Sequence, residues 1–500
     1  MKEHEEEPFL SDKALEDEYY KQRLLKVNAL REMKVDPYPV KSNFVDYISN
    51  IKRNFEDNKI NDKEDIVVVG RLFSKRLHGK MSFADIIDFT GKIQIQLKKD
   101  ILGEQYDFFK NYIDIGDFIQ VSGNIFRTKT GEITVLVKEL KILSKALRSL
   151  PEKWHGLKNV ELRYRFRYLD LISNQKTRDI FVKRSKIISF IRKFFESKGF
   201  LEVETPMLHL IPGGASAKPF VTYHNVLEKS LFLRIAPELY LKRLLIGNFH
   251  KIFEINRSFR NEGVSVKHNP EFTMLEAYQA YSDLDGMMLL TEELLVYLCE
   301  NVLGTTDVVY QGKTYSFKPP LRRIDFDESI KEYVGLTDEQ LKNKAFLQSF
   351  VKDLGCQFSS EWGIGRLKLE IFEHLVEKKI EEPTFVFGYP AEVSPLAKRD
   401  PSNPEKAHRF ELIVAGREIG NAHSELNDPV YQRNMFLEQA KLKESGDEEA
   451  QMMDDDFIFA LEHGMPPAGG LGLGIDRIVM LLTDSPSIRD VIFFPHLKPN

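Results

Sequence analysis

The sequence predicts an α+β protein with more than one domain: a five-stranded OB-fold β-barrel, followed by a larger domain built around a long β-hairpin. Three observations lead to this prediction. Hydrophobic residues alternate with a period of two over residues 66–143, the period is helical over residues 177–197, and two further alternating limbs span residues 252–281. With 500 residues, 42% of them hydrophobic, the chain can bury two or three separate cores.

The composition narrows the class of protein. The formal net charge is -5, from 71 basic and 76 acidic side chains, so any nucleic-acid site must be a local patch. The two cysteines, Cys299 and Cys356, are too few for a disulfide framework or a zinc site and suit a reducing compartment. The acidic N-terminal segment does not resemble a secretory signal, and no apolar run is long enough to span a bilayer. We therefore expect a cytoplasmic protein with no membrane partner.

The N-terminal part of the chain divides into two predicted segments. Residues 1–60 are highly charged, with a weak apolar stripe, and predict a helical extension. Residues 61–145 contain five strand-like runs separated by glycines, with a short helix-like segment at about residues 101–112 between the third and the fourth. This order is typical of an OB-fold, a common platform for single-stranded nucleic acid, although any small antiparallel barrel would fit the pattern equally well.

A basic linker is predicted at residues 146–175. Its lysines and arginines either contact a phosphate backbone or form a solvated face, which is the commoner use of such a run. The helix predicted at residues 177–197 carries a wide apolar stripe that fits a core or a dimer contact, and Gly199 is a plausible left-handed cap. Amphipathic helices at about residues 325–380 predict an insertion between strands.

The predicted hairpin at residues 252–281 carries an unusually polar face. Its first limb aligns Glu254, Asn256, Ser258, Arg260 and Glu262, and its second limb aligns Phe272, Met274, Glu276, Tyr278 and Ala280. The loop between the limbs carries Lys267 and His268. An antiparallel pair with one solvated face is the simplest explanation, and a ligand site would use the same alignment.

A second hairpin is predicted around a turn at Ala415 and Gly416, which would pair Ile413 with Glu418. Glu411 would then lie diagonal to Glu418 on one face. Two carboxylates so placed repel each other unless they share a cation, and Mg²⁺ takes carboxylates together with substrate phosphates. A β-bulge at Gly420 would bring three further polar side chains onto this face: Asn421, His423 and Glu425.

The common nucleotide-binding motifs are absent. The glycines of residues 469–474 fit no dinucleotide fingerprint, and the Gly-Lys-Thr at residues 312–314 has Asp307 where a phosphate-binding loop requires its first glycine. A nucleotide would therefore bind neither in a Rossmann crevice nor on a P-loop.

Several segments resemble a known family. Class II aminoacyl-tRNA synthetases share three signature motifs, and this sequence has segments similar to each, in the same order: GFLEVETPML, SFRNE and GLGLGIDR. Five segments resemble, more narrowly, the lysyl-tRNA synthetases: RYRFRYLDLI, GGASAKPF, RIAPELYLKRL, RNEGVSVKHNPEFTMLE and REIGNAHSELND. The resemblance extends over residues 66–495. It implies a catalytic domain in residues 176–500 with an antiparallel sheet flanked by helices, a homodimer formed through the first motif, and a barrel that binds the anticodon of tRNA(Lys).

The resemblance also implies a two-step reaction. The carboxylate of L-lysine attacks the α-phosphate of ATP, which gives lysyl-adenylate and pyrophosphate, and the 3′-terminal adenosine of the tRNA then takes the lysyl group. Arg260 matches the catalytic arginine on the α-phosphate and the lysine carboxylate, and Arg477 matches the arginine on the γ-phosphate. Glu411 and Glu418 match the Mg²⁺ ligands. The remaining matches to ATP contacts are Glu262, His268, Asn269 and Phe272, of which Phe272 would stack on adenine.

A pocket for the ammonium of lysine needs buried acceptors of negative charge. Glu238 and Glu425 match the ε-amino ligands, and the residues that match the rest of the lysine site are Gly214, Arg260, Glu276, Tyr278 and Asn421. His423 departs from the family, which usually carries Phe or Tyr there. We expect a neutral imidazole at pH 7 and weaker lysine binding where the ring is charged. In the barrel, the matches to anticodon contacts are Arg71, Phe83, Gln94 and Glu139.

Two other functions fit parts of this pattern. An enzyme that attaches lysine to a protein would use the same catalytic domain, but such enzymes usually lack the barrel predicted here. A non-catalytic RNA-binding relative should have lost Arg260, Arg477 or the metal carboxylates, and all of them are present. The sequence therefore favours a lysine–tRNA ligase that uses ATP and Mg²⁺.

Overall fold

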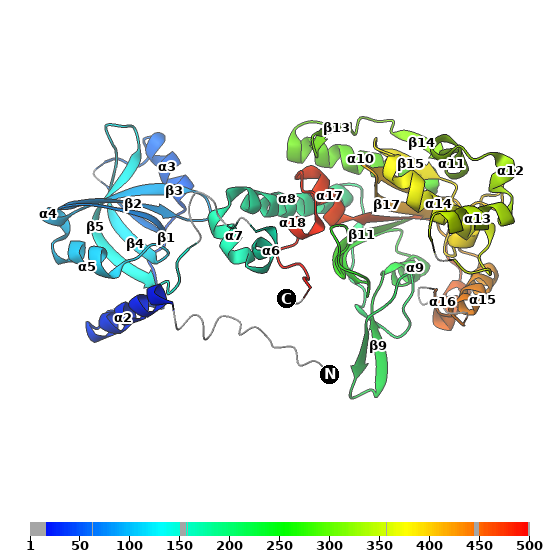
Figure 1. Cartoon of the computed structure of the whole chain (residues 1–500), viewed down its shortest axis with the longest axis horizontal. Coiled ribbons are helices and arrows are strands. Elements are labelled where there is room, and N and C mark those ends of the chain that lie inside the picture. The colour runs from blue at the N-terminus through cyan, green and yellow to red at the C-terminus, as the bar shows by residue number, and fades with distance from the viewer. Residues whose placement is uncertain are drawn as a thin grey trace. The chain divides into compact units, whose positions relative to one another are not determined.

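The computed structural model describes residues 17–62, 64–150, 157, 159–356, 358–444 and 450–498. They divide into two compact units, Met1–Lys158 and Asn159–Asn500. Figure 1 shows the helices and strands of each unit. The first 16 residues of the predicted helical extension lie outside the described residues.

The first unit is a closed β-barrel with the strand order β1-β2-β3-β5-β4 (Figure 1). Its elements are α2 (Glu18–Glu32), α3 (Ile48–Glu56), β1 (Asp65–His78), β2 (Met81–Ile87), β3 (Lys92–Lys98), α4 (Lys99–Leu102), α5 (Glu104–Tyr112), β4 (Phe118–Arg127) and β5 (Ile133–Ser144). Alternate residues of each strand point inward, so that Ile95 and Val121 are completely buried. The five strands, with helices between the third and the fourth, confirm the predicted barrel.

The described part of the extension preceding the barrel, residues 17–62, contains the helices α2 and α3. Ile48 and Ile51 of α3 join the hydrophobic core of the barrel. Arg23 of α2 donates hydrogen bonds to the carbonyl oxygens of Ile115 and Ala146, at 3.1 and 3.0 Å. The helices are therefore part of the first unit and not a separate arm.

The second unit is built on an eight-stranded sheet with the order β14-β15-β16-β17-β18-β11-β10-β6. Its first half comprises α6 (Val160–Arg165), α7 (Arg167–Ser173), α8 (Gln175–Ser197), β6 (Leu201–Glu202), β7 (Leu208–His209), β8 (Val221–His224), β9 (Lys229–Leu233), α9 (Glu238–Ile246), β10 (Lys251–Phe259), β11 (Glu271–Ala280) and α10 (Leu284–Leu303). The sheet is antiparallel except for its two edge pairs, β14–β15 and β10–β6, which are parallel. This agrees with the predicted antiparallel sheet flanked by helices.

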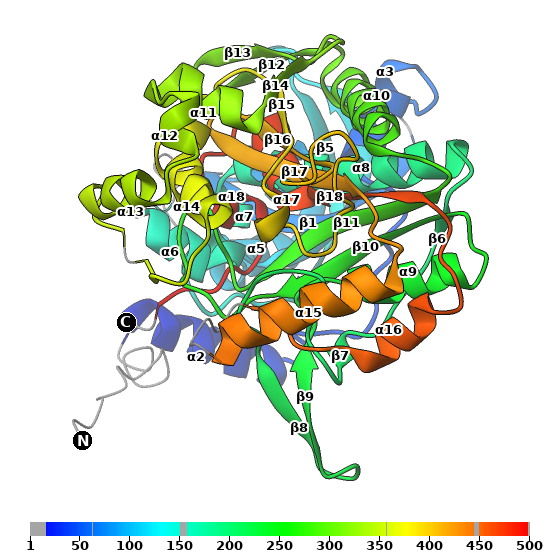
Figure 2. The same ribbon diagram turned by 90° about the vertical axis from the view of Figure 1, so that its right-hand side faces the viewer.

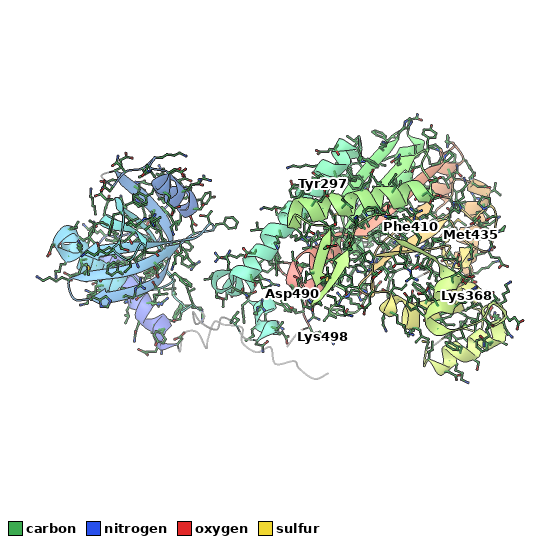
Figure 3. The ribbon with its side chains drawn as sticks, turned by 90° about the horizontal axis from the view of Figure 1, so that it is seen from above. Tyr297, Lys368, Phe410, Met435, Asp490 and Lys498 are labelled. Atoms are coloured by element: carbon green, nitrogen blue, oxygen red, sulfur yellow. The ribbon has the colours of Figure 1, made fainter. Side chains whose placement is uncertain are left out.

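Helices cover the sheet and complete its core. The rest of the unit comprises β12 (Asp307–Tyr310), β13 (Lys313–Ser316), β14 (Arg322–Asp325), α11 (Phe326–Val334), α12 (Asp338–Leu341), α13 (Lys344–Asp353), α14 (Ile364–Ile371), η1 (Phe372–Val376), η2 (Glu377–Lys379), β15 (Thr384–Phe387), η3 (Ala391–Val393), β16 (Arg409–Val414), β17 (Arg417–Ser424), α15 (Pro429–Glu444), α16 (Asp455–Leu461), β18 (Ala468–Gly474), α17 (Ile475–Leu482) and α18 (Ile488–Val491). Helices α15 and α16 lie side by side, and the β8–β9 hairpin projects from the unit (Figure 2). Figure 3 labels Phe410 on β16, Lys368 on α14 and Met435 on α15.

The apolar stripe of the helix predicted at residues 177–197 faces the core of its own unit. Ile187, Ile191 and Phe195 of α8 are completely buried in the largest hydrophobic cluster. Gly199 follows the helix with a φ of 80°, which is the predicted left-handed cap. Because the core occupies the stripe, α8 does not need a partner subunit to bury it.

Part of the predicted basic linker is folded into the second unit. Helices α6 and α7 lie within it, and Arg167 is completely buried, paired with Asp170 at 3.1 Å. Just before the predicted linker, within the first unit, Lys145 is buried against Asp117 at 2.8 Å. These two cations therefore serve packing and not a phosphate backbone. Residues 151–156 and 158 lie outside the described residues.

Both predicted hairpins are present, and the second has the register that was predicted for it. In β10–β11, Glu254 lies opposite Glu276. In β16–β17, Ile413 lies opposite Glu418, as predicted, and Leu412 then lies opposite Gly420, so Ile419 is the extra residue of a β-bulge. The bulge is thus one residue before the predicted position and still resets the alternation. Among the described residues, no helix is long and apolar enough to cross a membrane.

Candidate active site

Two adjoining cavities open on the central strands of the second unit. The first is lined from β11, β17, β18 and the loop after β10, and the second continues from the same strands toward α9, α14 and α15. Five residues line both: Arg260, Met274, Glu418, Asn421 and Gly472. A ligand with two chemically different parts could therefore span the cavities and pass Arg260.

The first cavity combines an aromatic ring with positive charge. The Arg260 guanidinium lies 5.1 Å from the centre of the Phe272 ring. Arg477, at the start of α17, donates hydrogen bonds to the backbone oxygen of Glu418 at 2.5 Å and to its Oε2 at 3.1 Å. This cavity therefore offers an aromatic ring on which a flat heterocycle can stack and two guanidinium groups that can bind attached phosphates.

The loop between β10 and β11 forms the rim of the first cavity, and it brings Glu262 and His268 to exposed positions. Asn269 is buried, and its amide is occupied within the protein: Oδ1 accepts from the His496 backbone N–H, and Nδ2 donates to the Glu271 oxygen. Asn269 therefore fixes the loop through its side chain.

Arg260 has an unused donor at the junction of the cavities. Its Nε is buried and has no hydrogen-bond partner among the described residues. Burial lowers the pKa of the guanidinium, and the neighbouring Glu262 and Glu418 oppose that effect. Since arginine stays protonated in proteins, the unsatisfied N–H favours an anionic ligand at this point.

Glu411 lies on β16 and Glu418 lies on β17, the two strands of the second hairpin. Glu411 accepts from Tyr389 Oη at 2.8 Å and from Arg409 at 2.5 Å, whereas Glu418 accepts from Asn421 at 3.1 Å. Burial raises the pKa of Glu411 to about 7, and the nearby Glu418 adds to this effect. Burial would also raise the pKa of Glu418, but Arg477, the hydrogen bond from Asn421 and the charge of Arg409 together outweigh it, so this pKa lies below the usual value. Each carboxylate has an arginine partner, Arg409 for Glu411 and Arg477 for Glu418, and the two still supply oxygen donors of the kind that Mg²⁺ takes.

The second cavity ends in a buried cluster of charges. Lys242 of α9 is completely buried, and its Nζ lies 2.7 Å from Glu238 Oε1 and 2.5 Å from Glu425 Oε2. His423 Nε2 lies 3.1 Å from the same Glu425 oxygen and 3.5 Å from Glu238. Glu238 and His423 line the cavity, and Glu425 lies behind them. Its Oε1 is buried and has no hydrogen-bond partner among the described residues.

The charges in this cluster determine one another's protonation. Burial alone would raise the pKa of Glu238, but Lys242 and His423 outweigh it and lower the pKa to about 2. Burial alone would lower the pKa of His423, but Glu425 and Glu238 outweigh it and raise the pKa to about 9. The neutral imidazole expected from the sequence is therefore wrong: His423 is protonated at pH 7, because two carboxylates from different elements surround it.

Other predicted lysine contacts lie along the same cavity. Glu276 accepts from Tyr278 Oη at 3.1 Å, and burial, followed by the charge of Glu238, raises the pKa of Glu276 to about 8. Gly214 has a φ of 88°, and a Cβ there would lie 3.0 Å from the Cβ of Glu238, so a larger residue would crowd the cavity wall. Three buried glutamates, Glu238, Glu276 and Glu425, therefore lie at this end of the cavity.

Among the side chains of the site that sequence reasoning missed are two cations that pair with its carboxylates. Lys242 follows Glu238 by four residues on α9, a spacing that suggests an ion pair but not complete burial. Arg409 pairs with Glu411, two residues along β16, and its guanidinium lies 4.7 Å from the centre of the Tyr389 ring. Both compensate carboxylates that the sequence did single out.

The predicted anticodon residues lie on the barrel of the first unit. Phe83 is half-buried and alternates with buried neighbours, so it points outward and is not a core residue. Arg71 donates to the Gly116 oxygen at 2.9 Å and lies 4.2 Å from the centre of the Phe118 ring. Gln94 accepts from Thr134, and Glu139 is exposed beside Lys141 at 3.1 Å. An outward aromatic beside polar side chains suits a stacked base.

Comparisons with known proteins match both units. Residues 159–498 match the family of tRNA synthetases class II (D, K and N), and residues 66–143 match an OB-fold nucleic acid binding domain. The chain is 52% identical over 484 residues to a lysine–tRNA ligase of Carboxydothermus hydrogenoformans, covering 97% of this chain and 98% of that protein. It is 52% identical over 479 residues to that of Thermoanaerobacter sp., covering 95% of each, and 49% identical over 485 residues to that of Clostridium novyi, covering 96% and 94%.

Proposed function

The chain belongs to the family of class II tRNA synthetases (D, K and N), and from this premise we propose that it is an ATP-dependent lysine–tRNA ligase. The observation that carries the choice of amino acid is the acidic end of the second cavity. Glu238 and Glu276 line it, and Glu425 is buried behind them. Buried carboxylates select a cationic side chain, and a pocket for an anionic or apolar amino acid would need the opposite charge or none.

We propose that ATP lies in the first cavity and lysine in the second. Phe272 stacks on the adenine, Arg477 holds the γ-phosphate, and Glu262, His268 and Asn269 form the wall around the nucleotide. Gly214, Glu276, Tyr278 and Asn421 orient the lysine backbone and stem, with Glu238, His423 and Glu425 at its ammonium. This arrangement directs the lysine carboxylate and the α-phosphate toward Arg260, which lines both cavities.

The first step then needs no protein nucleophile. A lysine carboxylate oxygen forms a bond to the α-phosphorus, and the bond to the β-phosphate oxygen breaks, so pyrophosphate leaves. Both reactants are anions, and Arg260 reduces their repulsion and stabilises the charge that develops between them. Its unpartnered Nε supports this role. Glu411 and Glu418 would hold Mg²⁺, which supplies positive charge to the phosphates when bound.

In the second step, a hydroxyl of the 3′-terminal adenosine of tRNA(Lys) attacks the carbonyl carbon of the adenylate, and AMP leaves. We propose that the barrel, residues 61–145, selects this tRNA through its anticodon, with Phe83 stacked on a base and Arg71, Gln94 and Glu139 as polar contacts. Residues 176–500 would form the catalytic domain, with the helices at about residues 325–380 as an insertion. A cytoplasmic location stays a prediction.

We also propose a homodimer. The region around the first family motif and the β8–β9 hairpin exposes apolar side chains that water would disfavour in an isolated subunit: Leu201, Met207, Leu208, Leu210, Val221 and Tyr223. Light scattering after gel filtration should give twice the chain mass of 58.0 kDa. A mass of one chain at micromolar concentration would contradict this proposal.

Two assays on the purified chain test the enzymatic proposal. ATP–pyrophosphate exchange should depend on lysine, and the chain should then transfer radioactive lysine to tRNA(Lys). Exchange without any transfer to tRNA would favour a protein-modifying enzyme, and the absence of exchange would favour a non-catalytic RNA-binding protein. Either result would refute the proposal.

A further inference from the structure

Two cations already pair with Glu238 and Glu425 at the closed end of the proposed lysine cavity. One is Lys242, whose Nζ bridges Glu238 and Glu425 and also donates to the Leu396 oxygen at 3.3 Å. The other is His423, whose Nε2 lies within 3.5 Å of both carboxylates. The two carboxylates are therefore fully compensated before any amino acid enters.

The positions of the two cations differ. Lys242 is completely buried and lies outside the cavity lining, so it is a fixed part of the wall. His423 lines the cavity, and Glu425 does not. The imidazolium thus stands where an incoming ammonium must approach the carboxylates.

From this geometry, and resting on the proposed function, we infer that lysine binds by proton exchange: the ε-ammonium of the substrate takes over the carboxylates, and His423 releases its Nε2 proton to water. If His423 kept the proton, three cations would face two carboxylates in a buried site. The exchange leaves two of each, so the charge of the site is the same before and after binding.

The charged and titratable groups around His423 fit this exchange. They are Glu425 after the same strand, Arg409 and Glu411 on β16, Glu238 and Lys242 on α9, and Glu276 and Tyr278 on β11. Arg409 is held by Glu411 at 2.5 Å, and Tyr278 is hydrogen-bonded to Glu276. On β18, the residue opposite His423 is Gly470, which carries no charge. His423 is therefore the cavity-lining cation that can become neutral near physiological pH, since its pKa is about 9.

The charge of the bound ammonium determines how far the pKa of His423 shifts. Two cations about 5 Å apart at an effective dielectric constant of about 20 shift each other's pKa by about two units. Lysine should therefore lower the pKa of His423 from about 9 to about 7. Lysine binding should then tighten about tenfold per pH unit between those two values and level off at lower pH.

Below both pKa values the ring is protonated in the free and the bound protein, and binding moves no proton. Between them the free protein holds a proton that the complex does not, so higher pH favours the complex. At pH 8 about 0.8 of a proton should leave per lysine bound.

Isothermal titration calorimetry of the full chain with L-lysine, in buffers of different ionisation enthalpy, measures this proton release. His423→Phe removes the titrating ring, and His423→Gln keeps a polar, non-titrating side chain in case Phe disturbs packing. Both variants should release about 0.8 fewer protons at pH 8 than wild type and bind lysine more tightly than wild type at pH 7. Protons released by Glu276 or by the α-amino group are common to all three proteins and cancel in the difference.

The outcomes separate this inference from the proposed function. If wild type and both variants release equal numbers of protons, with parallel dissociation constants from pH 6.5 to 8.5, the inference is wrong although lysine binds. If wild type does not bind lysine at all, the proposed function fails and the inference fails with it.

Discussion

Replacing Glu425 with glutamine removes one charge from the lysine site and changes the shape of the side chain very little. Glu425 is 1% exposed, and its Oε2 lies 2.5 Å from Lys242 Nζ. Losing one partner of a desolvated charge pair costs about 2–5 kcal/mol. Glu425 raises the pKa of His423 more than Glu238 does. In the variant the imidazole therefore loses its proton more easily, and this offsets part of the lost binding free energy for lysine.

We therefore expect the lower part of that range. A loss of about 2–3 kcal/mol corresponds to an increase of roughly 30- to 200-fold in the lysine KM, measured by ATP–pyrophosphate exchange at pH 7.5. The KM for ATP should stay the same, since Glu425 does not line the first cavity. Glu438→Gln, at an exposed position of α15, is the matched control and should change neither constant.

The melting temperature separates binding from folding. Lys242 keeps its partner Glu238 at 2.7 Å in the variant, so the cluster stays paired. A lysine KM equal to that of wild type would refute the role of Glu425. An equal loss for lysine and ATP, together with a large fall in melting temperature, would show that the residue acts through stability alone.

Three further substitutions test other parts of the site. Phe83→Ala should weaken tRNA charging by the roughly 1–3 kcal/mol that a stacked base contributes, and it should leave pyrophosphate exchange intact. Equal loss in both assays, together with a lower melting temperature, would indicate a packing role for the ring. Gly470→Ala would place a Cβ 1.8 Å from Glu425 Oε1 and 2.7 Å from Tyr278 Cε1, so the lysine KM should rise at least about tenfold. A lysine KM equal to that of wild type would contradict this geometry of the lysine pocket. Arg260→Lys replaces the forked guanidinium by a point charge and should lower the pyrophosphate-exchange rate by about 10²–10³. The melting temperature should change little, since Arg260 Nε has no hydrogen-bond partner among the described residues. Full activity would contradict the catalytic role of Arg260.

Hydrophobic periodicity predicted the secondary-structure elements whose signal lies in the local sequence. The barrel strands and the two hairpins follow from alternation and turn residues, and these signals lie within short stretches of sequence. The bulge was predicted at Gly420 and lies at Ile419. Its exact position depends on a neighbouring strand, because a Cβ at Gly420 would lie 2.5 Å from the Gly472 oxygen. No local pattern contains that contact.

The protonation state of the candidate site could not be predicted from the sequence. His423 was expected to be neutral, and its raised pKa results from Glu238 on α9 together with Glu425 after β17. Lys242 was missed for the same reason, since its complete burial depends on carboxylates from two distant segments. Family resemblance supplies positions, whereas the charge balance at those positions comes from the folded protein.

The most direct test of the central claim is a charging assay in which the purified chain is offered tRNA and each of the twenty amino acids in turn, with ATP and Mg²⁺. Lysine should be attached to tRNA(Lys) at least a hundredfold more efficiently than any other amino acid, because only an ammonium group can replace the proton of His423 at Glu238 and Glu425 (about 10³-fold for a loss of about 4 kcal/mol). Preferred charging with an anionic or neutral amino acid, or charging with none, would contradict the account.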